Sequence, residues 1–253
     1  IANLFVGLSY GWWQNKHNRH HANPNKEGYD PDIALGAIAM TPEKATRHSS
    51  RMMRWLVAHQ GWYFFPILLL EGLSLHWDGI KRVASRNKTE RRWVEVSFLA
   101  LRLGGFVALV FLVLSPDKAL AVLGVELAVF GFYMGFSFAP AHIGMPLVSP
   151  KLKLDFLRRQ VLVSRNISGG PLMSVFMGGL NYQVEHHLFP SMARPYLRRA
   201  QPLIVAYCAK MGVPYTQTNL WQAYRSVIGY LNTVGLRGKD PFLCPMVAQR
   251  RAI

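Results

Sequence analysis

"VEVSFLALRLGGFVALVFLVLSPDKALAVLGVELAVFGFYMGFSFA" (residues 94–139) is the stretch that decides the fold. It holds two apolar segments, 94–115 and 118–139, and each has the length of roughly 20 residues that a helix needs to cross ~30 Å of hydrocarbon. The linker "SPDK" (115–118) is so short that the two segments must run antiparallel. The sequence therefore predicts an all-α fold built around one membrane-spanning hairpin.

Basic residues lie on both outer flanks of this hairpin, in "KRVASRNKTERR" (81–92) and "KLKLDFLRR" (151–159). The turn carries one lysine and one aspartate, so the positive-inside rule places the flanks in the cytoplasm and the turn outside. The net charge of +16 over 253 residues forms no single stripe, and many of the basic residues crowd these flanks. This distribution favours a membrane surface over nucleic acid as the partner.

The remaining chain divides into a histidine-bearing start (1–54), an apolar segment with interspersed polar residues (55–80) and a mixed, helical part (141–253). We expect 55–80 to lie at the membrane interface or to be re-entrant, because it contains His59, Glu71 and other polar residues. A third spanning helix is the alternative. The two cysteines form no CxxC motif, which argues against a disulfide framework and against a thiolate metal site.

Two histidine motifs have helical spacing: "HNRHH" (17–21) reads HxxHH and "QVEHH" (183–187) reads QxxHH. Positions i, i+3 and i+4 share one face of a helix, so the polar side chains of each motif should point together. His142 follows the second apolar segment and would emerge on the side of the membrane where both motifs lie. The sequence therefore predicts that the three places converge.

Neutral imidazole is a common ligand of zinc, copper and iron. One zinc ion is usually satisfied by three or four protein ligands, so six converging histidines indicate two metal ions. The expected ligands are His17, His20, His21, His142, His186 and His187. His48, His59 and His76 have no partners at helical spacing and are expected to be ordinary structural histidines.

Several of these stretches together resemble the histidine-box membrane fatty acid desaturases. They are "GWWQNKHNRHHANPN" (11–25), "DPDI" (30–33), "APAHIGMP" (139–146), "RQVLVSRNISGG" (159–170) and "GLNYQVEHHLFPSM" (179–192). The QxxHH form is similar to the front-end branch and to its bacterial acyl-CoA or acyl-lipid relatives. The resemblance implies an oxygen-dependent enzyme with two iron ions, in which the membrane hairpin carries a cytosolic helical cap that holds a histidine-rich di-iron site.

The resemblance also implies roles for residues around the histidines. Gln183 could be a weak ligand, a hydrogen-bond donor or a residue packed under the site. Asp30 and Asp32 could accept the distal N–H of a ligand histidine. Asn181 and Glu185 could do the same or face solvent.

Three arginines, Arg158, Arg159 and Arg165, are candidates for binding a CoA phosphate or a lipid headgroup. The alternative is that they are ordinary positive-inside charges. The expected substrate is a fatty acyl chain carried by CoA or by a lipid, in a multi-pass membrane protein with a cytoplasmic active site.

The family's first box, an HxxxH motif upstream of "HNRHH", and its cytochrome b5 domain with an HPGG motif are not present in the 253 residues. We therefore expect one desaturase domain over 1–253 that lacks its N-terminal part and is inactive alone. A separate ferredoxin or cytochrome b5 type donor, with its reductase, would supply electrons. A lipid hydroxylase on the same scaffold and an inactive metal-binding remnant remain alternatives.

Overall fold

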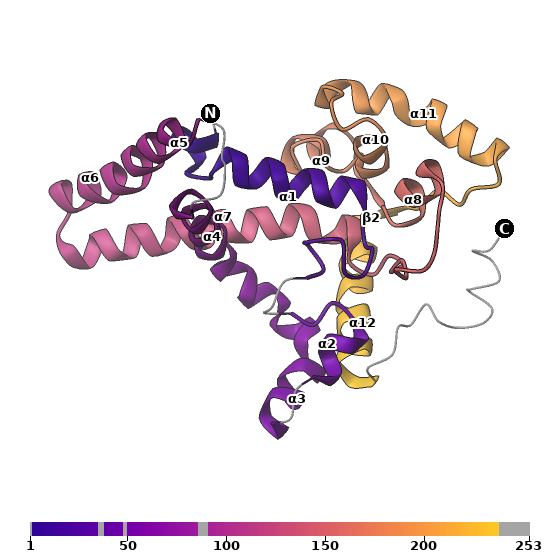
Figure 1. Cartoon of the computed structure of the whole chain (residues 1–253), viewed down its shortest axis with the longest axis horizontal. Helices are drawn as coiled ribbons and strands as arrows, with labels where there is room; N and C mark the ends of the chain where they lie inside the picture. The colour runs from indigo at the N-terminus through magenta and orange to yellow at the C-terminus, as the bar shows by residue number, and fades with distance from the viewer. Residues whose placement is uncertain (1, 35–37, 48–49, 86–90, 238–253) are drawn as a thin grey trace. The chain divides into compact units, whose positions relative to one another are not determined.

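A computed structural model describes residues 2–34, 38–47, 50–85 and 91–237 (Figure 1). The described residues are mostly helical, as predicted, and their strands are two segments of three residues each. It divides into two compact units, one of residues 1–18 and 65–136 and the other of residues 19–64 and 137–253. His48, Cys244 and part of the basic flank 81–92 lie outside the described residues.

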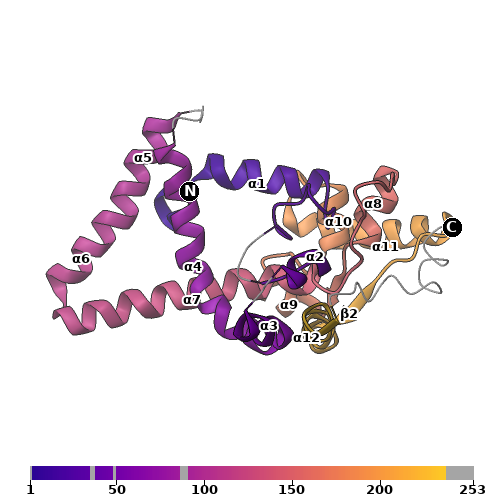
Figure 2. The same cartoon turned by 60° about the horizontal axis from the view of Figure 1, so that its bottom comes forward.

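The first unit holds the apolar helices. Its elements, three of which continue into the second unit, are η1 (Ala2–Val6), α1 (Tyr10–Ala22), α4 (Gln60–Ala84), α5 (Arg92–Leu99), η2 (Ala100–Gly105), α6 (Phe106–Val113) and α7 (Pro116–His142). Figures 1 and 2 show α5, η2 and α6 as one continuous rod that turns back into α7. This rod and α7 are the predicted hairpin.

Both arms of the hairpin, Arg92–Val113 and Pro116–His142, are long and apolar enough to cross a membrane. The turn is shorter than the predicted 115–118, because Pro116 to Lys118 already form the first turn of α7. Proline suits the first position of a helix, since that N–H has no intrahelical acceptor, and the Asp117 carboxylate complements the N-terminal dipole.

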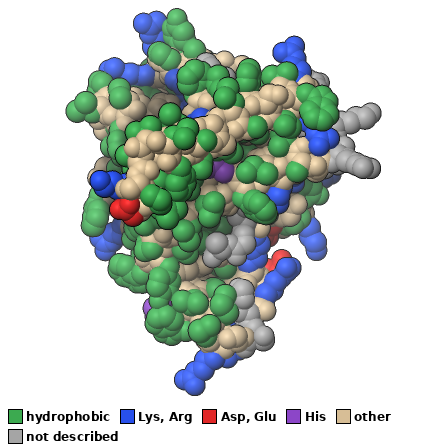
Figure 3. Space-filling view, turned by 90° about the vertical axis from the view of Figure 1, so that its left-hand side faces the viewer, with side chains coloured by type: hydrophobic (Ala, Val, Ile, Leu, Met, Phe, Trp, Pro, Cys, Tyr) green, Lys and Arg blue, Asp and Glu red, His purple; other side chains and the backbone are tan. Residues whose placement is uncertain are grey.

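The hairpin presents its apolar side chains outward. Only 11% of each candidate span is buried, and Leu112 is 84% exposed. In the space-filling view toward the hairpin, hydrophobic side chains cover much of the surface (Figure 3). An outward apolar surface of this kind is suited to lipid and not to water.

The predicted interfacial segment 55–80 is helical but broken at His59, between α3 (Arg51–Ala58) and α4. With 25 residues α4 is as long as a membrane-spanning helix, but it is not among the two described helices that are both long and apolar enough to cross a membrane. Within the first unit α4 crosses α7 at Gly72 and Gly131. A side chain on either glycine would collide with the backbone of the other helix.

The second unit carries the histidine motifs. Its further elements are α2 (Pro42–Thr46), α3, α8 (Phe156–Leu162), β1 (Asn166–Ser168), α9 (Gly170–Phe176), α10 (Gln183–Leu188), α11 (Arg194–Lys210), β2 (Gln217–Asn219) and α12 (Leu220–Arg237). A buried cluster that includes Val161, Val184 and Ile204 packs α8, α10 and α11 together. Strands β1 and β2 pair in parallel, and α12 packs against α3.

Candidate metal centre

The first histidine motif forms the last turns of α1, so the predicted helical spacing is present. His20 is buried, and His21 is half-buried next to it. His17 lies one turn before His21 on the same helix and stacks on Trp13, with 5.5 Å between the ring centroids.

Asp30 fixes the orientation of His20. Both carboxylate oxygens of Asp30 lie 3.0 Å from Nδ1 of His20, and Asp30 also accepts the backbone N–H groups of Asn25 and Asp32, at 2.7 and 2.9 Å. Asp32 lies farther from the same ring nitrogen, at 3.3 Å, and its side chain is 43% exposed. Because a carboxylate beside Nδ1 holds the proton there, Nε2 of His20 carries the lone pair that a metal requires.

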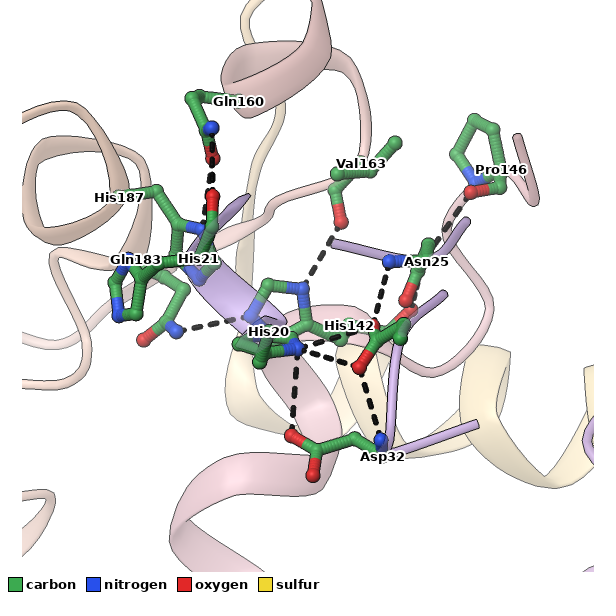
Figure 4. A network of polar contacts seen from close by, with 11 residues as sticks. His20, His21, Asn25, Asp32, His142, Pro146, Gln160, Val163, Gln183 and His187 are labelled. Atoms are coloured by element: carbon green, nitrogen blue, oxygen red, sulfur yellow. Dashed lines mark hydrogen bonds and ion pairs between the residues drawn. The ribbon is translucent and has the colours of Figure 1, made fainter. Parts of the chain in front are cut away.

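The turn "NPNKEGYDPD" (23–32) also joins the first motif to the end of α7 (Figure 4). The amide of Asn25 donates to the backbone carbonyls of His142 and Pro146, each at 3.2 Å. Asn25 has a positive φ of 52°, a conformation that asparagine tolerates better than most residues. This loop thus places His142, the last residue of α7, beside His20.

His142 is held by both of its ring nitrogens. Its Nδ1–H donates to the carbonyl of Val163 at 3.1 Å, and its Nε2 accepts from the amide of Gln183 at 2.9 Å. Gln183 is therefore a hydrogen-bond donor to the predicted ligand His142, one of the roles expected for it.

The second motif forms the short helix α10, and both of its histidines are buried. Nδ1–H of His187 donates to Oε1 of Gln160 at 3.0 Å. Gln160 lies on α8, is completely buried, and also donates its amide N–H to the backbone carbonyl of His21 at 2.9 Å. Gln160 thus contacts both histidine motifs, as Figure 4 shows.

Five predicted ligands of the second unit meet in one cluster. The ligand nitrogens of His20, His142 and His187 lie within 4.8 Å of one another. The His21 ring packs edge-on against His186 and is stacked on His187, with centroid separations of 4.6 and 4.2 Å.

The buried polar atoms of the cluster fit a cation. Nε2 of His187 and Oε1 of Gln183 are buried acceptors for which the described residues offer no hydrogen-bond partner. Such atoms are costly unless something else binds them. Burial, followed by the neighbouring imidazoles, lowers the pKa of His187 well below its usual value, so its ring is neutral. Neutral imidazoles and an amide oxygen form a donor set compatible with a transition metal.

Glu185 has neither of its two expected roles, because it is buried and its carboxylate is bonded to Asn166 and Tyr215 and not to an imidazole. It is completely buried and accepts from the Asn166 amide at 2.6 Å and the Tyr215 hydroxyl at 2.7 Å. Asn166 also accepts the backbone N–H of Val184 at 2.9 Å. A helix of six residues is not stable alone, so these contacts fix α10 against β1 and the segment before β2.

The hydrogen bonds and ion pairs that the described residues show for the other predicted residues do not involve the imidazoles. Asn181 donates to Ser174, and Arg158 pairs with Asp155 at the start of α8. Arg159 is half-buried on α8. Arg165 is buried and donates to the backbone carbonyls of Pro140, Ala223 and Ile143, so its guanidinium is not presented to a headgroup.

Two further histidines have the ordinary structural roles expected of them. His59 contacts the carbonyl of Trp55, and His76 contacts that of Gly7. Each ring nitrogen lies 2.8 Å from its carbonyl oxygen, so these histidines are held by backbone contacts.

The chain matches the family model for fatty acid desaturases over residues 1–219. An acyl-lipid (9-3)-desaturase of Physcomitrium patens is 30% identical to it, over 87% of this chain and 43% of that protein. An acyl-lipid 8-desaturase of Rebecca salina is 30% identical over 90% and 52%. A delta(8)-fatty-acid desaturase of Helianthus annuus is 27% identical over 95% and 55%.

No solved structure matches the chain. The chain spans about half the length of the curated relatives that it matches. The family match covers both histidine motifs, the membrane-length hairpin and the loops that join them. This chain therefore belongs to the fatty acid desaturase family.

Proposed function

We propose that this chain is the core of a membrane fatty acid desaturase, which introduces a double bond into a fatty acyl chain. The observation that carries the proposal is the buried cluster in which His20, His142 and His187 bring their ligand nitrogens within 4.8 Å of one another. His142 is the last residue of a membrane-length helix, which suits a site that acts on a membrane-embedded chain.

In this proposal six histidines hold two iron ions. His20, His142 and His187 hold one of them, and His21 and His186, with His17 on the same helix as His21, hold the other. Iron supplies the oxygen activation and oxidising power that an unactivated methylene C–H bond requires and that no amino-acid side chain has.

The reaction removes one hydrogen atom from each of two adjacent methylenes and forms the C=C bond. With O2, two electrons and two protons, it releases two water molecules. The side chains keep the imidazoles neutral and oriented. Asp30, the Val163 carbonyl and Gln160 hold the Nδ1 protons of His20, His142 and His187, so that Nε2 would be the ligating nitrogen of each. At His142 the metal would take the place of the Gln183 amide, which donates to Nε2 in this structure.

The membrane arrangement in this proposal follows the charge pattern. The hairpin crosses the bilayer, its turn lies outside, and both histidine motifs face the cytoplasm. Residues 55–80 lie at the interface, and 141–237 form the helical cap. This orientation predicts that a cysteine introduced at position 116 reacts with a membrane-impermeant reagent added outside the cell.

Two relatives are named as acyl-lipid desaturases, the (9-3)-desaturase and the 8-desaturase, which favours a lipid as the carrier of the acyl chain, with CoA as the alternative. Electrons would come from a ferredoxin or cytochrome b5 type protein with its reductase. Of the predicted arginines, Arg158 and Arg159 remain candidates for contact with the anionic headgroup or CoA phosphate.

Product analysis tests the proposal. The full-length protein and its His187→Ala variant are expressed at matched membrane amounts, and lipids are examined by mass spectrometry that locates double bonds. The expected result is an unsaturated acyl product that the variant does not form. Hydroxylated chains would favour the related hydroxylase. Unchanged lipids in cells with a suitable electron donor would favour a metal-binding remnant and contradict desaturation.

A further inference from the structure

We propose that Gln160 is a positioning residue that sets the tautomer of His187 and joins the two histidine motifs. The inference rests on the proposed metal site and extends it to a residue outside both motifs. Gln160 is completely buried on α8, and its carboxamide lies between Nδ1 of His187 and the backbone carbonyl of His21 (Figure 4).

The orientation of the Gln160 amide follows from its backbone partner. The His21 carbonyl can only accept a hydrogen bond, so the atom 2.9 Å from it must be the amide nitrogen of Gln160. The amide oxygen then faces His187, at 3.0 Å from Nδ1. A flipped amide would place two acceptors against each other at His21 and would lose that bond.

This orientation determines where His187 carries its proton. A neutral imidazole has one N–H and one lone pair, and the Gln160 oxygen requires the N–H to be at Nδ1. Nε2 therefore holds the lone pair, and it is the buried atom for which the described residues offer no hydrogen-bond partner. Gln160 thus prepares the nitrogen that a metal would bind.

The same side chain also couples the two motifs in space. His21 and His187 are stacked, with 4.2 Å between ring centroids and an interplanar angle of 25°. Gln160 holds the backbone of the first and the ring of the second, so the relative position of the two motifs depends on one carboxamide. A residue that only fills the core would have no effect on the protonation of a particular ring nitrogen.

The first test uses the metal-free 253-residue chain in detergent, with 15N-labelled histidine rings. NMR distinguishes protonated from lone-pair ring nitrogens, and the His187 signals are assigned by their loss in His187→Gln. Wild type should carry the proton on Nδ1. Gln160→Glu retains an acceptor oxygen and should preserve this tautomer, whereas Gln160→Leu should give a mixture or the opposite tautomer.

Gln60→Leu is the matched control. Gln60 is also a buried glutamine, but its hydrogen bonds go to the backbone of Ala39 and Leu231 and not to the histidine motifs. The Gln60→Leu variant should lose stability without a change in the tautomer of His187. A proton on Nε2 of His187 in wild type, or an unchanged tautomer in folded Gln160→Leu, would overturn the proposal.

The second test is a competition titration of the full-length protein with Co(II). Gln160→Leu should weaken Co(II) binding by about 10- to 100-fold, the usual effect of removing a hydrogen-bond partner of a ligand histidine. Gln60→Leu should bind as wild type does, and an equal loss in both variants would reduce Gln160 to a structural role. Failure of wild type to bind Co(II) would count against the proposed metal site, while the tautomer measurement would still decide the role of Gln160.

Discussion

Replacing Asp30 by asparagine should weaken both the fold and the metal site. The two carboxylate oxygens of Asp30 accept one backbone N–H each, from Asn25 and Asp32, and both face Nδ1–H of His20. An asparagine has only one acceptor atom, so in either orientation its NH2 group faces a backbone N–H. One buried donor is left unsatisfied, which costs about 1–3 kcal/mol of unfolding free energy.

The loss of negative charge at Nδ1 also removes the preference of His20 for the tautomer that presents Nε2. Metal affinity should fall by about 10- to 100-fold. Thermal unfolding and a Co(II) competition titration measure the two effects separately. Asp32→Asn is the control, because Asp32 is 3.3 Å from the ring nitrogen and partly exposed, and it should change both quantities less. Wild-type stability and affinity in Asp30→Asn would refute this reasoning.

Three further predictions concern other parts of the chain. His142→Ala should abolish desaturation at normal membrane insertion while His59→Ala retains it; activity in the first variant would exclude His142 as a ligand. Tyr215→Phe removes the hydroxyl that donates to the buried carboxylate of α10, and urea unfolding should show a loss of about 1.5–3 kcal/mol. Gly61→Ala would place its Cβ 2.6 Å from a carbonyl oxygen of α12 and should cost about 1–3 kcal/mol. The added Cβ of Gly229→Ala, also on α12, would have no neighbour within 4 Å, so this variant should not be destabilised. Equal melting temperatures of Gly61→Ala and Gly229→Ala would contradict the close packing at Gly61.

The hairpin and the histidine motifs are predictable because their signals are local. An apolar run of membrane length and a spacing of i, i+3 and i+4 can be recognised without any tertiary contact. The predicted turn extends three residues into the first turn of α7, because Pro116 and Asp117 favour both a turn and the start of a helix.

The supporting residues are harder to predict because their partners are remote in sequence. Gln160 bonds to residues 139 positions before it and 27 positions after it, and glutamine has no spacing rule of its own. Arg165 looked like a flanking charge, yet it is buried against three carbonyls, because burial depends on how α7, α8 and α12 pack. The family motif that contains both residues was visible, but their roles required the three-dimensional contacts.

The iron content of the purified full-length protein tests the central claim most directly. We expect two iron ions per chain, measured by inductively coupled plasma mass spectrometry after expression in iron-supplied cells. His20→Ala and His186→Ala should each reduce this content, while His59→Ala should retain it. Stoichiometric zinc instead of iron, or an iron content that both cluster variants leave unchanged, would contradict the assignment of the histidine cluster as the metal centre.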